Sequence, residues 1–212
     1  MAILKVNPTR IALLSLKKEL KVAQKGHKLL KDKRDGLVKK FMAVIYETKS
    51  LRESVEDRLG SAFDSYTRAT SMTASAALNT ALMVPNAKVD LDVKIQSVMS
   101  VKIPEFNIEK KGTAFSYGML ETTGDLDNAM VKFDTVFLDI IRLAQLEKTA
   151  ENLAEEIEKT RRRVSALENV RIPNLNDTIK FITMQLDERN RDAVVSTMRV
   201  KAMILAKEEQ TS

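Results

Sequence analysis

Apolar side chains recur through the first sixty residues at alternating steps of three and four. Eleven of the fifteen positions on this stripe are apolar: Leu13, Leu16, Leu20, Ala23, His27, Leu30, Arg34, Leu37, Phe41, Val44, Thr48, Leu51, Val55, Arg58 and Ala62. A repeat sustained over about seven heptads is typical of a coiled-coil seam. Asn7 is a favoured N-cap and Pro8 is tolerated at a first helical position. We therefore expect a long helix over residues 7–75.

A second amphipathic run begins after the hydroxyl and carboxylate side chains of residues 122–125 (Thr-Thr-Gly-Asp), which suit the start of a helix. Two apolar stripes follow. The first comprises Leu143, Leu146, Ala150, Leu153, Ile157, Thr160, Val164 and Leu167, and the second comprises Leu175, Ile179, Ile182, Leu186, Ala193 and Val200. This pattern predicts a C-terminal helix over residues 124–208.

The two C-terminal stripes are out of phase with each other. Two consecutive steps of four lead from Leu167 through Arg171 to Leu175, and such a break locally unwinds a left-handed supercoil. Pro173 lies at the break, where it removes the hydrogen bond to the carbonyl of Asn169. We expect one helix with a kink here, and with the seam continuing on both sides.

The segment between the helices, residues 76–123, has a different periodicity. Residues 88–95 alternate strictly between apolar and polar side chains, the polar pair Gln96-Ser97 follows, and a second apolar run over 98–103 ends at Pro104. Period two with β-branched residues predicts a β-hairpin near residues 88–104 and a loop over 105–121. Because an isolated hairpin is marginal in water, it should pack on the helices or on a partner.

These elements together predict a mainly α fold in a single domain, residues 1–212. Two long helices separated by a compact insertion can bury both seams by folding back antiparallel, with both termini at one end and the insertion at the other. Composition agrees, because charged residues make up 30% of the chain and aromatic residues only 5%. That balance favours long helices over a bulky core.

Positive charge is concentrated at the N-terminal end. Residues 1–40 contain twelve Lys and Arg against three Asp and Glu, whereas residues 41–140 contain ten against fourteen. The candidate contact residues here are Arg10, Lys17, Lys21 and Lys28. The excess is compatible with an acidic partner, a nucleic acid or an anionic membrane surface, or with a solvated helix face.

Two of these partners fit poorly. Nucleic-acid binding needs stacking or base readout besides charge, and the ten Phe and Tyr residues fall mostly in seam or insertion positions. No stretch approaches 18 uninterrupted apolar residues, and the amphipathic faces are needed for the partner helix. We expect no nucleic acid and no direct membrane insertion.

A second basic cluster is the triplet Arg161, Arg162 and Arg163. Successive helical residues advance by roughly 100°, so the triplet cannot form a single-faced track. In a helical hairpin it should pass near residues 40–55, where Glu47 and Glu53 are candidate partners. Pairing within the chain and contact with another protein both remain open.

Residues for catalysis, metal binding or cofactor binding are missing. The chain has no Cys, and its one histidine, His27, falls in the seam, where it suits a register-setting polar residue. No phosphate-cradling glycine motif occurs. Gly26 and Gly36 are either tolerated or mark a place where another backbone approaches closely. We expect no catalytic residue, no cofactor and no metal.

Several strings resemble the D subunit of the V-type and A-type rotary ATPases. They are residues 7–10 (Asn-Pro-Thr-Arg), the basic run 26–35, the hairpin string 99–104 (Met-Ser-Val-Lys-Ile-Pro) and the helical string 156–168 with Ile172-Pro173. The likeness extends from residue 7 to about residue 205. Ser165 is a small departure, because the family often has Asn there.

The resemblance implies a non-catalytic central-stalk rotor that couples ATP hydrolysis or synthesis to the transport of H⁺ or Na⁺. Its implied partners are the catalytic A and the B subunits of the hexamer, the small F subunit, and the collar subunit of the membrane ring. Its implied location is cytoplasmic and peripheral to the membrane. The hairpin contributes Met99 and Val101 as further candidate contacts.

A free-standing coiled-coil scaffold or tether is the competing interpretation. It explains the seam equally well, but it does not explain the ordered family strings. A scaffold should form a stable homodimer. A rotor shaft should be an unstable or promiscuous monomer alone and become stable with its small partner subunit.

Overall fold

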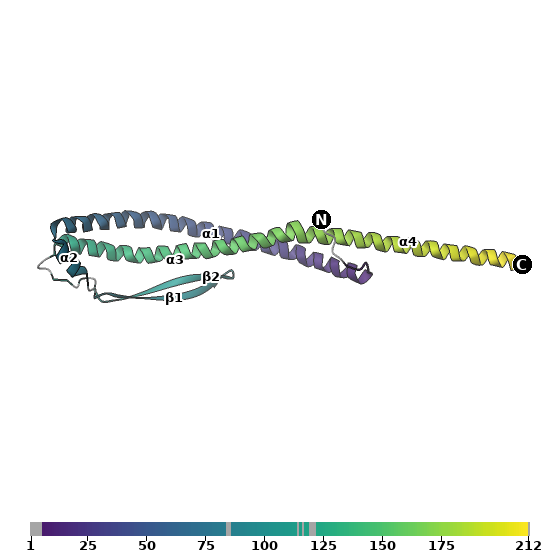
Figure 1. The fold of residues 1–212 in the computed structure, drawn as a ribbon, viewed down its shortest axis with the longest axis horizontal. Helices are drawn as coiled ribbons and strands as arrows, with labels where there is room; N and C mark the ends of the chain where they lie inside the picture. The colour runs from purple at the N-terminus through teal and green to yellow at the C-terminus, as the bar shows by residue number, and fades with distance from the viewer. Residues whose placement is uncertain (1–5, 84–85, 114, 116, 119–121, 212) are drawn as a thin grey trace. The chain divides into compact units, whose positions relative to one another are not determined.

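The computed structural model describes residues 6–83, 86–113, 115, 117–118 and 122–211. Its elements are α1 (Arg10–Met72), α2 (Ser75–Leu82), β1 (Lys88–Val98), β2 (Val101–Lys111), α3 (Gly124–Ala166), a π-helical turn η1 (Leu167–Arg171) and α4 (Ile172–Thr211) (Figure 1). The predicted mainly α fold, with long N- and C-terminal helices and a central antiparallel hairpin, is confirmed. The chain forms two compact units: a terminal unit (residues 1–34 and 159–212) and a hairpin unit (residues 35–158).

Thr9 caps the start of α1. The amide N–H of Ala12 donates to Thr9 Oγ1 at 3.1 Å, and that of Leu13 donates to the Thr9 carbonyl at 3.0 Å. The expected start at Asn7 is therefore wrong by two residues. Thr9 acts as the cap instead of Asn7, and Pro8 lies just before the cap rather than at the first helical position.

In the terminal unit, the first part of α1 packs antiparallel against α4. Leu16, Leu175 and Ile182 are buried and form a cluster flanked by half-buried aliphatic residues. The direction follows from polar contacts whose residue numbers fall on one helix as they rise on the other: Arg10 with Asn190, Glu19 with Arg171 and His27 with Glu168. Burying one stripe on each helix is what the heptad spacing predicts.

The phase break coincides with the π-helical turn η1. The N–H of Ile172 donates to the carbonyl of Leu167, five residues back. Pro173 lies directly after this bond and cannot donate one of its own, and its ring would crowd the carbonyl four residues earlier in a regular α-helix. A widened turn relieves that crowding, so the sequence break appears as an inserted π-turn between α3 and α4.

In the hairpin unit, the second part of α1 pairs with α3. Arg58 bonds Asp139 at 2.6 Å, Arg142 lies 3.3 Å from Glu47, and Arg52 pairs with Glu147. A buried cluster of Ala69, Leu78 and Leu126 joins α1, α2 and α3. The antiparallel helix pair is thus present in this unit as well.

The hairpin is longer than its sequence pattern suggested. Its strands pair from Lys88 with Lys111 to Val98 with Val101, so the turn is Met99-Ser100, and residues 105–111 are strand. The expected polar break at Gln96-Ser97 and the expected loop from residue 105 are both wrong. Pro104 pairs with Ile95 without ending the strand, because each strand of a two-stranded ribbon has a free edge, where proline is tolerated.

Strand β2 attaches the hairpin to α3, and the two elements lie side by side in Figure 1. Asn152 Nδ2 donates to the Lys102 carbonyl at 2.9 Å, and the Phe106 N–H donates to Gln145 Oε1 at 3.2 Å. Lys110 forms an ion pair with Asp134. Main-chain groups of the strand are satisfied by helix side chains, so this two-stranded sheet has the tertiary support that an isolated hairpin lacks.

Candidate functional site

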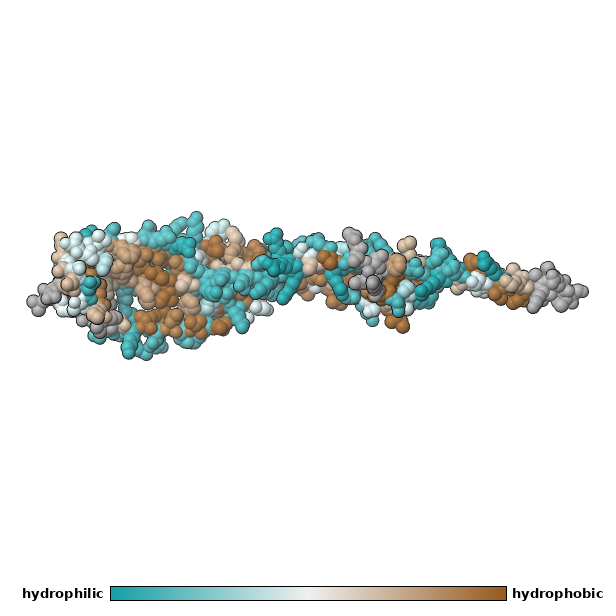
Figure 2. Space-filling view, viewed as in Figure 1, coloured by the Kyte–Doolittle hydropathy of each residue, from teal (hydrophilic) through white to brown (hydrophobic). Residues whose placement is uncertain are grey.

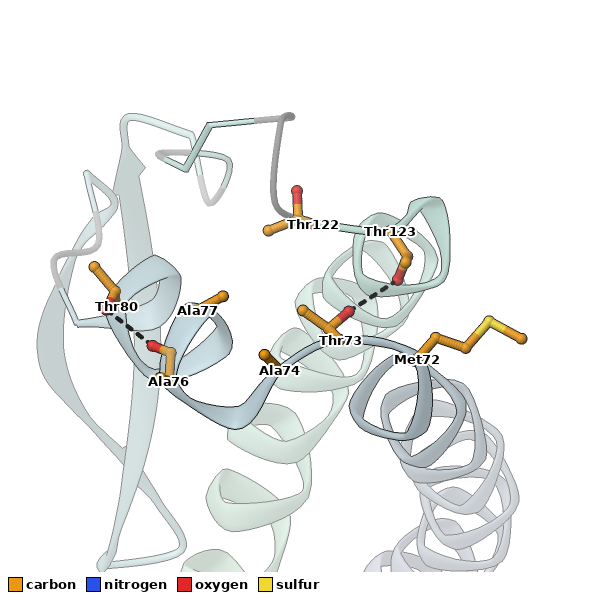
Figure 3. A pocket seen from close by; sticks show the side chains of 8 residues that line it. All are labelled: Met72, Thr73, Ala74, Ala76, Ala77, Thr80, Thr122 and Thr123. Atoms are coloured by element: carbon orange, nitrogen blue, oxygen red, sulfur yellow. Dashed lines mark hydrogen bonds between the residues drawn. The ribbon is translucent and has the colours of Figure 1, made fainter.

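One open pocket, of about 650 Å³, lies in the hairpin unit where α1, α2 and α3 meet. Its lining consists of alanine, methionine and threonine side chains (Figure 3). Thr73 and Thr123 place their hydroxyl oxygens 3.5 Å apart across it. No lining residue is charged, so this pocket offers no general acid or base. Among the described residues, no group of three His, Cys, Asp or Glu could hold a metal ion.

The predicted basic contacts of α1 form a single stripe. Arg10, Lys17, Lys21 and Lys28 are separated by steps of seven, four and seven, which keep them within about 40° on a helix. All four side chains are exposed. Arg10 reaches the Asn190 side chain at 3.5 Å, so the stripe flanks the groove between α1 and α4.

Beside this stripe, α1 presents exposed aliphatic side chains that the sequence analysis missed. Ile11, Leu14, Val22 and Leu29 are 61–82% exposed. Steps of eleven and seven place Ile11, Val22 and Leu29 on one line, away from the seam. Their signal in the sequence was a second apolar stripe between the lysines, overlooked beside the stronger seam. A face that mixes lysine with exposed aliphatics suits a protein partner better than bulk water.

The last part of α4 is also apolar and exposed. The side chains concerned are 47–66% exposed: Val194, Val195, Met198, Val200, Met203 and Ile204. Helix α1 begins at Arg10, which lies beside Asn190. Because the chain runs antiparallel, α1 cannot cover residues 193–204. The sequence analysis had assigned Ala193 and Val200 to the seam, whereas both are exposed.

Both glutamates expected near the arginine triplet have other partners. Glu47 pairs with Arg142, and Glu53 lies 4.0 Å from Lys49 on its own helix. Arg161, Arg162 and Arg163 belong to the terminal unit, and all three side chains are exposed. Contact of the triplet with residues 40–55 and contact with another protein both stay predictions.

The two hairpin candidates occupy different environments. Val101 is 4% exposed and packs against Leu37 and Leu153, so it belongs to the attachment of the hairpin. Met99 is 41% exposed at the turn. The apolar residues of β1 are freely accessible at 40–68% exposure, namely Val89, Leu91, Val93 and Ile95. Figure 2 shows apolar side chains gathered over the hairpin and its neighbouring helix.

None of the described helices has the length and apolarity needed to cross a bilayer. The surfaces that stand out are instead suited to proteins: a basic and aliphatic face on α1, an apolar end of α4, and an exposed strand.

Comparison with known proteins gives one consistent result. The sequence profile of the family described as the D subunit of ATP synthase matches residues 12–202. Similar proteins include the V-type ATP synthase D subunit of Thermoanaerobacter sp. (strain X514), 45% identical over 97% of this chain and 99% of that protein. Those of Clostridioides difficile (strain 630) and Acetivibrio thermocellus are 45% and 46% identical, covering 98% and 97% of this chain and 95% and 94% of the respective relatives.

Proposed function

Because the chain belongs to the family of ATP synthase D subunits, we propose that it is the non-catalytic central-stalk subunit of a V-type ATP synthase, turning as a rotor shaft. The observation that carries the proposal is the extent of the family match, which takes in the long helices and the hairpin alike. The pocket between α1, α2 and α3 has a neutral lining, which fits a role in transmitting motion between sites on other chains.

As a shaft, the chain couples ATP turnover in a hexamer of A and B subunits to the movement of H⁺ or Na⁺ through a membrane ring. Its location is then cytoplasmic and peripheral to the membrane. Long helices joined by a seam resist twisting better than loops do. The coupling is a free-energy difference between states, because each shaft angle favours a different conformation of the catalytic interfaces.

The terminal unit is our candidate for the contact with the hexamer. Its basic stripe (Arg10, Lys17, Lys21 and Lys28) and the exposed triplet Arg161–Arg163 offer many separate, weakly held contacts. Exposed ion pairs are individually worth about 1 kcal/mol or less, so a set of them can be exchanged at each step without trapping the shaft. The exposed aliphatics of α1 and of residues 193–204 add contact area without adding directional bonds.

Truncation tests this placement. Removing residues 1–10 and 200–212 takes away the first stripe residue and the end of α4, and leaves the buried cluster of Leu16, Leu175 and Ile182 intact. We expect ATP hydrolysis to persist while ATP-driven ion transport falls in the reconstituted complex. Fully coupled transport by the truncated complex would show that the contacts lie elsewhere.

The exposed face of β1 is our candidate for binding the small F subunit, and the hairpin is proposed to tune the rate of hydrolysis. Strand β2 is already held by α3, whereas the aliphatic side chains of β1 stay 40–68% exposed. Replacing residues 88–111 by a short linker should leave assembly intact and change the ATPase rate. Loss of assembly, with an unchanged rate in any complex that survives, would contradict this role.

The neutral pocket between α1, α2 and α3 is our candidate for the collar subunit of the membrane ring. Its alanine and threonine lining suits a small apolar or hydroxyl side chain from a partner. Ala77→Trp would fill the pocket, and it should weaken binding of the collar subunit without affecting ATP hydrolysis by the hexamer. Unchanged collar binding would remove the pocket from the interface.

Hydrodynamics separates the shaft from a free-standing scaffold. Alone, a shaft should be an unstable or non-specifically associating monomer. With the F subunit, it should form a well-defined heterodimer. A stable homodimer with no affinity for the F subunit would favour the scaffold.

A further inference from the structure

The hairpin turn adopts a backbone that its residues disfavour. Met99 has φ 53° and Ser100 has φ 68°, and among the described residues they are the only non-glycine positions with positive φ. A two-residue turn with both central φ values positive favours Asn-Gly, because an L side chain crowds the backbone in this region. Such a conformation persists where the surrounding structure determines it. The turn is therefore held by something outside itself.

The side chain of Met99 identifies what holds it. A Cβ built on Gly36 of α1 would lie 3.0 Å from Met99 Cε and 3.9 Å from Met99 Sδ. The methyl end of Met99 thus occupies the space left by the missing side chain of Gly36. Gly26, ten residues earlier on the same helix, has nothing within 4 Å of the equivalent position. Of the three glycines in α1, Gly26, Gly36 and Gly60, only Gly36 is closely approached, and the approaching group is a side chain.

Neighbouring contacts continue this attachment. Leu37, next to Gly36, is fully buried against Val101 and Leu153. One residue further along β2, the Lys102 carbonyl accepts a hydrogen bond from Asn152 at 2.9 Å. The tip is therefore fixed to α1 by Met99 and to α3 by Val101 and Lys102, all within the hairpin unit.

We propose that Met99 and Gly36 form a releasable latch that decides whether the hairpin tip lies on the helices or leaves them. In the docked state, the tip gains the burial of Val101 and the Met99 contact, and it accepts the left-handed backbone at residues 99 and 100. In the released state, the turn relaxes and those contacts are lost. The contacts favour the docked state and the unfavourable turn backbone favours the released state. A partner bound to the exposed face of β1 can therefore shift the equilibrium between the two.

Replacing Met99 should have opposite effects depending on whether its side chain is the latch or only the geometry of the turn matters. Asn tolerates positive φ better than Met, so Met99→Asn should strengthen a turn that holds itself. If Met99 is instead the latch, Met99→Asn weakens the attachment although it improves the turn. Hydrogen exchange of the backbone amides of residues 88–111, measured on the full chain alone and bound to its partner subunit, distinguishes the two.

We expect Met99→Asn to speed exchange of these amides by roughly tenfold, with the amides of residues 13–30 unchanged. Slower exchange in Met99→Asn would overturn the latch. A second pair of variants places the same side chain at the two glycines. Gly36→Leu fills the space that Met99 occupies and should speed hairpin exchange, whereas Gly26→Leu should leave it unchanged. Equal exchange in these two variants would also overturn the latch. None of these readouts depends on ATP turnover, so the latch and the rotor function can fail separately.

Discussion

The terminal unit and the hairpin unit are built from parts of the same helix α1, with the same heptad spacing, yet different elements pack on it. In the terminal unit α4 packs on α1, and Ile11, Val22 and Leu29 stay exposed on the outer side of α1. In the hairpin unit a third element adds Val101 to the pair Leu37 and Leu153, and these three residues are 0–4% exposed. The seam of the terminal unit is nearly as well buried, because Leu16, Leu175 and Ile182 are 0–6% exposed. Heptad spacing is therefore sufficient to bury the seam between two helices, and the hairpin adds a third contacting element rather than deeper burial.

The seams also differ in their regularity. In the terminal unit His27 interrupts the aliphatic stripe, and its Nε2 is buried with no hydrogen-bond partner among the described residues. The π-turn η1 and Pro173 follow on the facing side of the seam. Ion pairs cross both helix pairs, Glu19 with Arg171 in the terminal unit and Arg58 with Asp139 in the hairpin unit, so they do not account for the difference. The terminal unit is therefore the place where substitutions can raise stability, and the hairpin unit is the place where they should lower it.

The largest expected effect is in the hairpin unit. Leu37→Ala empties the centre of the three-element cluster and should lower the free energy of unfolding by about 2–5 kcal/mol. The matched variant Leu29→Ala, on the same helix at 69% exposure, should change it by less than about 0.5 kcal/mol. Urea unfolding followed by circular dichroism measures both. Similar losses in the two variants would contradict the central place of Leu37 in this cluster.

The next effect concerns the π-turn of the terminal unit. A proline inside a helix costs about 3 kcal/mol relative to alanine. Because η1 already relieves part of the crowding at Pro173, Pro173→Ala should raise the free energy of unfolding by about 1–2 kcal/mol. A thermal or urea unfolding curve is sufficient to test this. A loss of stability would mean that the seam from Val164 to Leu175 needs the widened turn.

A smaller gain is expected at the polar interruption of the seam. His27 Nε2 lies 3.5 Å from Glu168 Oε2, but it makes no hydrogen bond to any residue that the structure describes. His27→Leu removes the unsatisfied atom and should stabilise the terminal unit by about 1 kcal/mol. Its control is His27→Gln, which keeps a polar group at the site and should bring no gain. Equal stability of the Leu and Gln variants would show that the buried nitrogen is already satisfied, for example by water.

The smallest effect is a pH dependence confined to the hairpin unit. Burial, together with the hydrogen bond to Asp127 at 2.7 Å and the charge of that carboxylate, raises the pKa of Tyr117. A raised folded-state pKa contributes stability below the unfolded value near 10, and this contribution is lost as pH rises beyond it. Stability should therefore fall from pH 9 to pH 11, and Tyr117→Phe should make the fall shallower. An equally steep fall in Tyr117→Phe would assign it to other groups.

Patterns of period 3.5 and period two were sufficient to predict the helices and the existence of the hairpin. The register of the paired strands and of the paired helices was harder to predict. Pro104 looked like a strand end, but a two-stranded ribbon has free edges that accept proline, and the strand continues to Lys111. The register of the helices decides which side chains Arg161–Arg163 face, and heptads alone leave it open to shifts of whole turns.

Contacts between distant segments were the hardest to predict. The sequence suggested that Gly26 and Gly36 are either tolerated or mark a close approach, but it could not indicate that Met99 lies over Gly36 while Gly26 is open. The sequence does contain a second apolar stripe at Ile11, Val22 and Leu29. Only the structure of the helix pair shows that this stripe faces outward.

The most direct test of the proposed rotor function is single-molecule rotation. The chain has no cysteine, so Gln96→Cys on the exposed strand β1 provides one attachment point for a bead or gold particle. With the hexamer of A and B subunits fixed to a surface, addition of ATP should make the particle turn in one direction in discrete steps. A particle that stays fixed relative to the hexamer while ATP is hydrolysed would contradict the proposal that this chain is the rotor.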